Sequence, residues 1–247
     1  MKKSTKKRLI FSPIILIGIF IIFLFVWTSS YYKPTDETVA VFQSDSSITI
    51  ERGKYITFTP KTSTNTGFIF YPGGKVEEEA YAPLCKSIAR EGYKVVIVPM
   101  PLKLAVLGKN KATDVMKAYP EIRNWAIGGH SLGGVMAANY AYANPSSIKA
   151  LILYASYPQT SNNMSSQDIK VLSSWGSKDG VADINKIKAA KTLLPNDSIF
   201  QSIEGGNHGQ FGNYGFQKGD NASNISTSQQ QQIAVNSTVD ILLEISK

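Results

Sequence analysis

Residues 125–134 read Trp-Ala-Ile-Gly-Gly-His-Ser-Leu-Gly-Gly. The apolar residues 125–127 predict a buried strand, and the small residues after Leu132 predict a helix that can lie close to a sheet. Between them, residues 129–133 form a G-x-S-x-G pattern, which in a strand–turn–helix setting puts Ser131 on a sharp turn with its hydroxyl exposed. The pattern alone also fits a glycine-rich turn with an ordinary serine. The strand and helix around it favour Ser131 as a nucleophile.

Strands and helices alternate along the rest of the chain. Buried strands are predicted at 68–71, 94–99, 148–154, 169–175 and 198–203, and helices at 80–90, 112–118, 183–193 and 228–246. Three shorter segments, 39–42, 47–51 and 55–59, have the alternating pattern of antiparallel edge strands. This order predicts an α/β fold, with a mostly parallel central sheet and helices on both faces.

A serine hydroxyl needs a base to remove its proton, and only two histidines occur in the chain. His130 adjoins Ser131, so its side chain should point away from the hydroxyl, which favours local packing or a polar contact. His208 follows a strand in a glycine-rich loop and is the candidate base. Asp179 follows another strand and is the candidate acid that orients the imidazole. Asp183 is held in reserve, because it is the expected N-cap of the next helix.

The order Ser131, Asp179, His208 is that of alpha/beta hydrolases. From about residue 67 to 212 the chain resembles this superfamily, and in particular small bacterial members related to dienelactone hydrolases. Those members carry a Tyr-Pro-Gly-Gly-Lys-Val segment, found here at 71–76. The resemblance implies an alpha/beta hydrolase fold. Dienelactone hydrolases proper use a cysteine nucleophile where this chain has serine, so their substrate is not carried over.

The resemblance also implies an oxyanion hole made of backbone N–H groups. One belongs to Leu132, the residue after the nucleophile. The other comes from the loop at 73–76, where Gly74 and Lys75 are the candidates and the residues themselves do not decide between its N–H groups. Many relatives insert a lid domain after the sixth strand, but residues 155–168 are too few for one. We expect an open site, bordered by the apolar loop 100–107, which is either an acyl-binding wall or core packing.

The N-terminus has its own composition. Five basic residues within 1–8 precede nineteen uncharged residues at 9–27, which as a helix would span roughly 28 Å. We expect a basic cytoplasmic tail at 1–8, a transmembrane signal anchor at 9–27, a linker at 28–38 and the hydrolase domain at 39–247. The chain would then be a single-pass protein of the cell membrane, with its hydrolase domain extracellular. A cleaved signal peptide is the alternative, and the length of the run disfavours it.

Composition excludes other classes. The net charge of +8 falls to about +3 without the five N-terminal basic residues, so it gives no argument for nucleic acid binding. The single cysteine, Cys85, cannot form an internal disulfide and lies on an apolar helical face, which favours core packing. The sequence contains no metal-ligand cluster, phosphate-binding loop or dinucleotide fingerprint, so we expect no metal and no cofactor.

These observations predict a membrane-anchored serine hydrolase of the carboxylesterase class. It would cleave carboxylic esters or thioesters through an acyl-enzyme on Ser131, with His208 as base and Asp179 as acid. A small ester or acyl compound is the expected substrate, and the cytoplasmic membrane is the expected partner of the N-terminal helix. An acyltransferase with the same triad and a non-catalytic surface-displayed binding module are the alternatives. The intact triad argues against the second.

Overall fold

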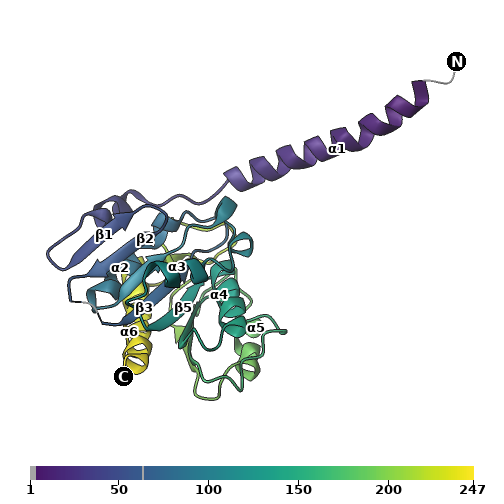
Figure 1. Cartoon of the computed structure of the whole chain (residues 1–247). Helices are drawn as coiled ribbons and strands as arrows, with labels where there is room; N and C mark the ends of the chain where they lie inside the picture. Colours follow the sequence, from purple (N-terminus) through teal and green to yellow (C-terminus); the bar gives the residue numbers. More distant parts are fainter. Residues whose placement is uncertain (1–3, 63) are drawn as a thin grey trace. The chain divides into compact units, whose positions relative to one another are not determined.

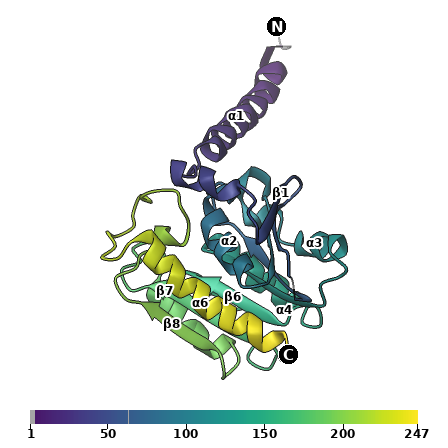
Figure 2. The same cartoon turned by 90° about the vertical axis from the view of Figure 1, so that its left-hand side faces the viewer.

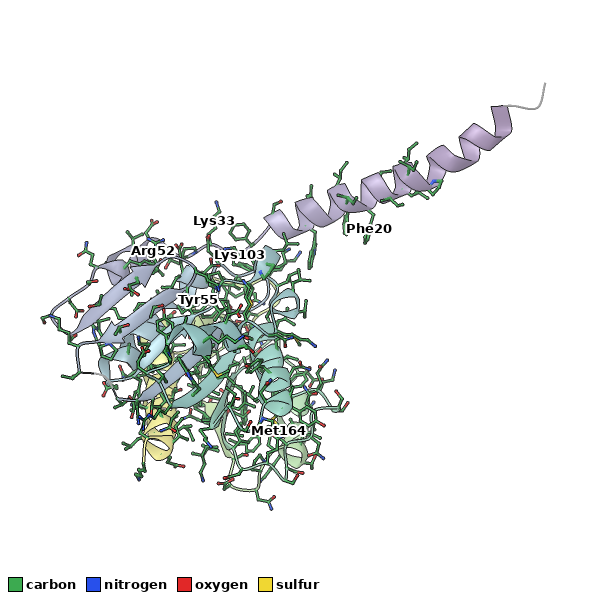
Figure 3. All side chains as sticks on the ribbon, in the orientation of Figure 1. Phe20, Lys33, Arg52, Tyr55, Lys103 and Met164 are labelled. Atoms are coloured by element: carbon green, nitrogen blue, oxygen red, sulfur yellow. The ribbon has the colours of Figure 1, made fainter. Side chains whose placement is uncertain are left out.

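The computed structural model describes residues 4–62 and 64–247, apart from the side chains of residues 4–12, 24, 25 and 28. Contacts divide the chain into two units, Met1–Tyr31 and Tyr32–Lys247 (Figure 1). The first unit contains the helix α1, Ser4–Ser29, in which Phe20 is 59% exposed (Figure 3).

The first unit corrects one prediction. Within the described residues, no helix is both long enough and apolar enough to cross a bilayer. The predicted transmembrane signal anchor at 9–27 is therefore wrong, and the membrane partner that depended on it is unsupported. The side chains of the predicted basic tail, 1–8, lie outside the described residues, and the localisation stays a prediction.

An eight-stranded sheet forms the centre of the second unit, in the order β1-β2-β4-β3-β5-β6-β7-β8. The strands are β1 Ile48–Arg52, β2 Ile56–Pro60, β3 Thr66–Tyr71, β4 Lys94–Ile97, β5 Asn124–His130, β6 Ala150–Tyr154, β7 Lys170–Gly176 and β8 Ile199–Ile203. All neighbouring pairs from β4 to β8 are parallel, and β1 and β2 are antiparallel at one edge. The predicted α/β fold with a mostly parallel central sheet is thereby confirmed.

Helices cover both faces of the sheet. The helices are α2 Ala82–Arg90, α3 Ala112–Ala118, α4 Leu132–Ala143, α5 Ile184–Ala189 and α6 Thr227–Ile245. One core cluster joins α2 and α6 to one face, and the other joins α3 and α4 to the opposite face. Adjacent strand residues such as Phe68 and Ile69 belong to different clusters, as the two-residue period of a strand requires. Figure 2 shows α6 lying along the face formed by β6 and β7.

Six short 3₁₀ helices complete the described elements. They are η1 Asp36–Phe42, η2 Glu78–Tyr81, η3 Pro101–Lys103, η4 Ala105–Leu107, η5 Ala190–Leu193 and η6 Gly209–Phe211. The predicted strand at 39–42 is wrong, because these residues belong to η1. The Lys86 ammonium donates to the carbonyl oxygens of Val41 and Gln43, so a lysine rather than a neighbouring strand binds this segment.

The topology fixes where a ligand can bind. β3 pairs with β4 on one side and with β5 on the other. After β3 the chain therefore turns toward β4 on one side, and after β5 it turns toward β6 on the other side. In open parallel sheets, the crevice at such a switch point is the usual ligand site. Loop 73–76 and Ser131 follow these two strands.

Candidate active site

Ser131 lies between β5 and α4 with φ 51° and ψ −123°, a conformation that residues with a side chain rarely adopt. Two hydrogen bonds hold it. Its N–H donates to the Tyr154 carbonyl at 2.9 Å, and its carbonyl accepts from the Ser156 hydroxyl at 2.9 Å. Ser131 itself is partly exposed. A strained, partly exposed serine at the end of a central strand has the geometry of a nucleophile elbow.

The tightness of this turn explains the glycine at 133. A Cβ on Gly133 would lie nearer to two carbonyl oxygens at the end of β3 than any real Cβ does to a neighbouring atom. Because one oxygen belongs to Tyr71 of β3 and the other to Pro72, the next residue, neither can move without moving the end of the strand. The helix that follows Ser131 can approach β3 this closely only without a side chain at 133.

Asp179 and His208 form a buried pair, although 29 residues separate them. His208 Nδ1 lies 2.8 Å from Asp179 Oδ2, and their side chains are 1% and 0% exposed. The other carboxylate oxygen of Asp179 accepts from the N–H groups of Val181 and Ala182 at 2.8 and 2.7 Å. With Nδ1–H donated to Asp179, the lone pair of His208 is on Nε2, the atom that a general base uses.

The pair lies beside the elbow. The rings of His130 and His208 are 4.5 Å apart between centroids, and His130 immediately precedes the serine. The Nε2 atom of His208 is buried without a hydrogen-bond partner among the described residues, so the Ser131 hydroxyl does not bond to it here. Such contacts are often long in enzymes without substrate.

The reserve acid has a different role. Asp183 accepts from the N–H groups of Asn185 and Lys186 at 3.0 and 3.3 Å and caps α5. Of the two carboxylates considered from the sequence, Asp179 is therefore the one that the fold brings to His208.

His130 is buried in the core, beside the ring of His208. Its Nδ1 lies 2.9 Å from the hydroxyl of Tyr81, and both residues are buried. Burial above all, and then the neighbouring His208, hold the pKa of His130 well below its ordinary value. The residue next to the nucleophile is therefore neutral.

Most N–H groups of the loop after β3 already have acceptors. Gly73 N–H donates to the Tyr81 hydroxyl at 3.0 Å, and Lys75 N–H donates to the Lys103 carbonyl at 2.8 Å. Val76 N–H donates to the Gly73 carbonyl at 3.3 Å. The Lys75 N–H, one of the sequence candidates for the oxyanion hole, is thus engaged with a neighbouring loop.

Gly74 differs from its neighbours. Among the hydrogen bonds of residues 73–76 in the described structure, none uses the Gly74 N–H. A Cβ on Gly74 would lie 3.0 Å from Leu132 Cδ2, so this residue is packed against the first residue of α4. The N–H groups at the start of a helix have no partner within it. The N–H groups of Gly74 and Leu132 are therefore two available hydrogen-bond donors, on residues that pack against each other.

Asp220 was not predicted from the sequence. Its carboxylate links the loop after β7 that carries Asp179 (the acid loop) to the loop after β8 that carries His208 (the base loop). One carboxylate oxygen accepts from the N–H groups of Gly180, His208 and Asn221 at 3.0, 3.3 and 2.9 Å. The other accepts from Gly209 N–H at 2.9 Å. No spacing in the sequence indicates these contacts, because all four partners are backbone groups.

Gln230 of α6 supports the base loop from behind. Its amide oxygen accepts from Asn207 N–H at 2.9 Å, and its amide nitrogen donates to the Asn207 carbonyl at 2.8 Å. The side chain is fully buried. A sequence signal existed here, since Gln230 falls in a four-residue series with Ala234 and Thr238 on the buried face of α6.

The loop at 100–107 was expected to form either an acyl-binding wall or part of the core. Met100 and Ala105 are buried in the core, whereas Leu102, Val106 and Leu107 are 58%, 46% and 54% exposed. Loop 100–107 adjoins loop 73–76, here called the oxyanion loop, through the hydrogen bond from the Lys75 N–H to the Lys103 carbonyl. It therefore packs with one set of side chains and presents the other set to solvent.

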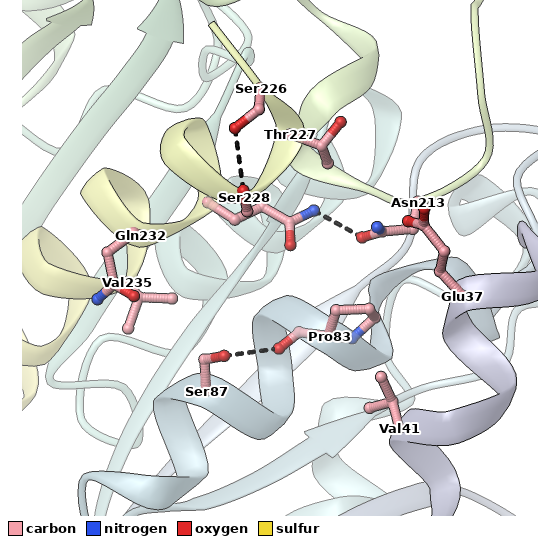
Figure 4. Close-up of a pocket in the computed structure, with 11 residues that line it drawn as sticks. Glu37, Val41, Pro83, Ser87, Asn213, Ser226, Thr227, Ser228, Gln232 and Val235 are labelled. Carbon is pink, nitrogen blue, oxygen red and sulfur yellow. Dashed lines mark hydrogen bonds between the residues drawn. The ribbon is translucent and has the colours of Figure 1, made fainter.

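A polar cavity of about 540 Å³ lies elsewhere on the second unit, between η1, α2 and the start of α6 (Figure 4). Its lining includes Glu37, Pro83 and Ser226 but none of the three candidate catalytic residues. The cavity is therefore separate from the site beside the elbow.

Comparisons with known proteins agree with this geometry. A family model described as the alpha/beta hydrolase family matches residues 67–232, which include Ser131, Asp179 and His208. No curated protein matches the sequence.

Three similar solved structures illustrate the fold. A CIB-like hydrolase from Thermoplasma acidophilum is 17% identical with a TM-score of 0.59, over 78% of this chain and 98% of that one. A dienelactone hydrolase from Anabaena variabilis is 12% identical with a TM-score of 0.59, over 82% and 97%. A carboxylesterase from Bacillus subtilis is 11% identical with a TM-score of 0.57, over 84% and 95%. The resemblance to alpha/beta hydrolases is thus confirmed by the family model, and these three structures share the fold.

Proposed function

This chain belongs to the alpha/beta hydrolase family, and we propose that it cleaves carboxylic esters or thioesters through an acyl-enzyme on Ser131. One observation carries the proposal: a buried His208–Asp179 pair at 2.8 Å lies beside a strained serine at the sheet's switch point. A carboxylate bound to Nδ1–H of an imidazole leaves Nε2 as the acceptor that a serine hydroxyl requires.

The reaction has two halves. His208 Nε2 takes the Ser131 proton while Oγ attacks the acyl carbon, and the carbonyl electrons move to its oxygen. The N–H groups of Gly74 and Leu132 stabilise this oxyanion. When the tetrahedral intermediate collapses, the bond to the alcohol or thiol breaks and His208 protonates the leaving group. Water, activated by His208, then releases the acid from Ser131, while Asp179 orients the imidazole and stabilises its cation.

Two observations support an ester substrate, and a third supports a short acyl chain. The similar structures include a carboxylesterase, and the loop at 100–107 offers exposed apolar side chains next to the oxyanion loop. Residues 155–168 are too few to close over a long acyl chain, and each methylene left in water forfeits about 0.8 kcal/mol of binding. We expect p-nitrophenyl butyrate to exceed the palmitate ester in kcat/KM, with or without detergent micelles. A higher value for palmitate would contradict this part of the proposal.

The two aspartates provide a matched test. Asp179→Asn should lower kcat for p-nitrophenyl butyrate by about 10³- to 10⁴-fold, because the imidazole loses the group that fixes its tautomer. Asp183→Asn removes the same charge from the cap of α5 and should leave kcat within a few-fold of the unmodified protein. Loss of activity in the Asp183 variant, with activity kept in the Asp179 variant, would overturn the assignment of the acid.

A further inference from the structure

The hydroxyl of Tyr81 lies directly beneath the loop that carries Gly74. It accepts from Gly73 N–H at 3.0 Å and lies 2.9 Å from His130 Nδ1. The side chain is fully buried, and its ring packs against Phe70 at 4.9 Å between centroids. A Cβ on Gly73 would lie 2.6 Å from the hydroxyl and 2.8 Å from His130 Nδ1, so the loop rests on this pair.

The tautomer of His130 decides the direction of these hydrogen bonds. The Tyr81 oxygen accepts the Gly73 N–H and has one proton of its own, and His130 Nδ1 lies within hydrogen-bond distance of it. The other ring nitrogen, Nε2, is buried without a hydrogen-bond partner among the described residues in either tautomer. With the proton on Nδ1, the buried Tyr81 O–H would lack an acceptor as well, whereas with the proton on Nε2 only Nε2 is left unpaired. The chain of donors therefore runs from Gly73 through Tyr81 to His130.

The electrostatics agree with this direction. Burial raises the pKa of Tyr81 far above its ordinary value and lowers that of His130 well below it. Both groups are therefore neutral, and a neutral imidazole with an unprotonated Nδ1 can accept the hydroxyl proton.

Gly74 is fixed from both sides. Tyr81 holds the N–H of the residue before it, and the Lys103 carbonyl holds the N–H of the residue after it. Glycine has no side chain to restrict its own backbone, so these neighbours decide where its N–H points. We propose that Tyr81, oriented by His130, is a positioning residue that aims the Gly74 N–H into the oxyanion hole. The inference rests on the esterase function proposed above and extends it to two residues outside the triad.

Tyr71 offers a matched control in the same protein. Its hydroxyl is also fully buried, accepts from Ala112 N–H at 2.9 Å and donates to the Lys109 carbonyl at 2.9 Å. Tyr71→Phe and Tyr81→Phe therefore remove the same kind of hydroxyl, each leaving a backbone N–H without its acceptor. The Tyr71 hydroxyl holds the loop before α3, so only the Tyr81 variant disturbs the oxyanion loop.

We expect Tyr81→Phe to lower kcat for p-nitrophenyl butyrate by about 10- to 100-fold, less than the loss of a whole oxyanion donor. KM should stay within three-fold, and the affinity for a boronic acid that mimics the tetrahedral intermediate should fall about as much as kcat. Tyr71→Phe should lower the Tm by a similar amount but leave kcat and boronic acid affinity unchanged. Normal kcat and affinity in the Tyr81 variant would overturn the proposal.

Variants of His130 test its part. His130→Leu removes the acceptor and should behave like Tyr81→Phe. His130→Asn keeps an acceptor, because Oδ1 is as many bonds from the backbone as Nδ1, and should restore much of the activity. The Tyr81→Phe/His130→Leu double variant should be little worse than either single one, because both act through the Gly73 N–H. Additive losses, or an asparagine variant as inactive as the leucine one, would contradict the role of His130.

Amide hydrogen exchange separates this inference from the esterase proposal. Tyr81→Phe should speed exchange at Gly73 at least ten-fold, and Tyr71→Phe should not, whatever the substrate proves to be. If the unmodified protein cleaves no ester, the esterase proposal fails, and exchange still decides whether Tyr81 holds the loop. Unchanged exchange at Gly73 in the Tyr81 variant would overturn the positioning role itself.

Discussion

The nucleophile and the base are held by different means. Besides its hydrogen bonds to Tyr154 and Ser156, Ser131 depends on close approach of backbone to backbone, which requires the missing side chain at Gly133. His208 is held by side chains from elsewhere in the chain: Asp179 bonds its ring, and Asp220 bonds its N–H. A close backbone approach tolerates no added atom, whereas each hydrogen bond contributes part of the stability and can be lost on its own. Substitutions on the two sides should therefore differ in kind as well as in size.

The largest effect should come from the nucleophile side. Gly133→Ala would press a methyl group into carbonyl oxygens at the end of β3. Because that backbone lies in the sheet, we expect destabilisation of more than about 3 kcal/mol, with loss of activity. Gly53→Ala is the control, since nothing lies within 4 Å of a Cβ there. Chemical denaturation of both variants measures the difference. Equal stability would mean that the elbow is not sterically closed.

A smaller effect should come from Asp220. Asp220→Asn keeps one acceptor oxygen but turns an NH₂ group toward backbone N–H groups that the carboxylate now binds. We expect a loss of about 2–3 kcal/mol in the free energy of unfolding and roughly a ten-fold loss of kcat/KM, because hydrogen bonds to charged groups contribute about 1.5–3 kcal/mol.

Asp197→Asn is the control for charge. Its carboxylate pairs with Lys170 on the surface with 58% of its side chain exposed, so its removal should cost less than about 1 kcal/mol. If the Asp220 variant were no less stable than this control, the two loops would not depend on the carboxylate.

The smallest effect should come from Gln230. Gln230→Leu leaves the N–H and carbonyl of Asn207 buried without partners, which should cost about 1–2 kcal/mol while activity falls only a few-fold. Gln232→Leu on the exposed face of α6 breaks one bond to Asn236 and should cost less than about 0.5 kcal/mol. Urea denaturation distinguishes the two. Similar midpoints would show that the base loop stands without α6.

This contrast also explains what the sequence could predict. The close backbone approach near Ser131 requires glycines at nearby positions in the sequence, so the elbow could be predicted from residues 125–134 alone. The candidate partners Asp179 and His208 could be named because loops at strand ends meet at one edge of a parallel sheet. Asp220 could not, because its four acceptor bonds go to backbone groups as far as 40 residues away. The choice of Gly74 over Lys75 as the oxyanion donor required the structure, in which Tyr81 binds the Gly73 N–H and Lys103 binds the Lys75 N–H.

The fold shows the same division. Alternating strands and helices were predicted from their hydrophobic periods, which depend on the nearest residues along the chain. The segment at 39–42 has a strand-like pattern, yet it forms η1, and Lys86 binds the carbonyl of Val41 within it and that of Gln43 just after it. The expectation for residues 9–27 rested on the length of the apolar run and on the basic residues before it, and it did not hold within the described residues. Local patterns predict an element well only where no distant group competes for its backbone.

The central claim is that the His208–Asp179 pair activates Ser131. The most direct measurement is the rate of labelling by a fluorophosphonate probe, with the labelled residue identified by peptide mass spectrometry. The account predicts one label, on Ser131, and a rate reduced by about 10³-fold or more in His208→Ala, because the serine then has no base. A label on another serine, or a Ser131 rate unchanged in that variant, would contradict it.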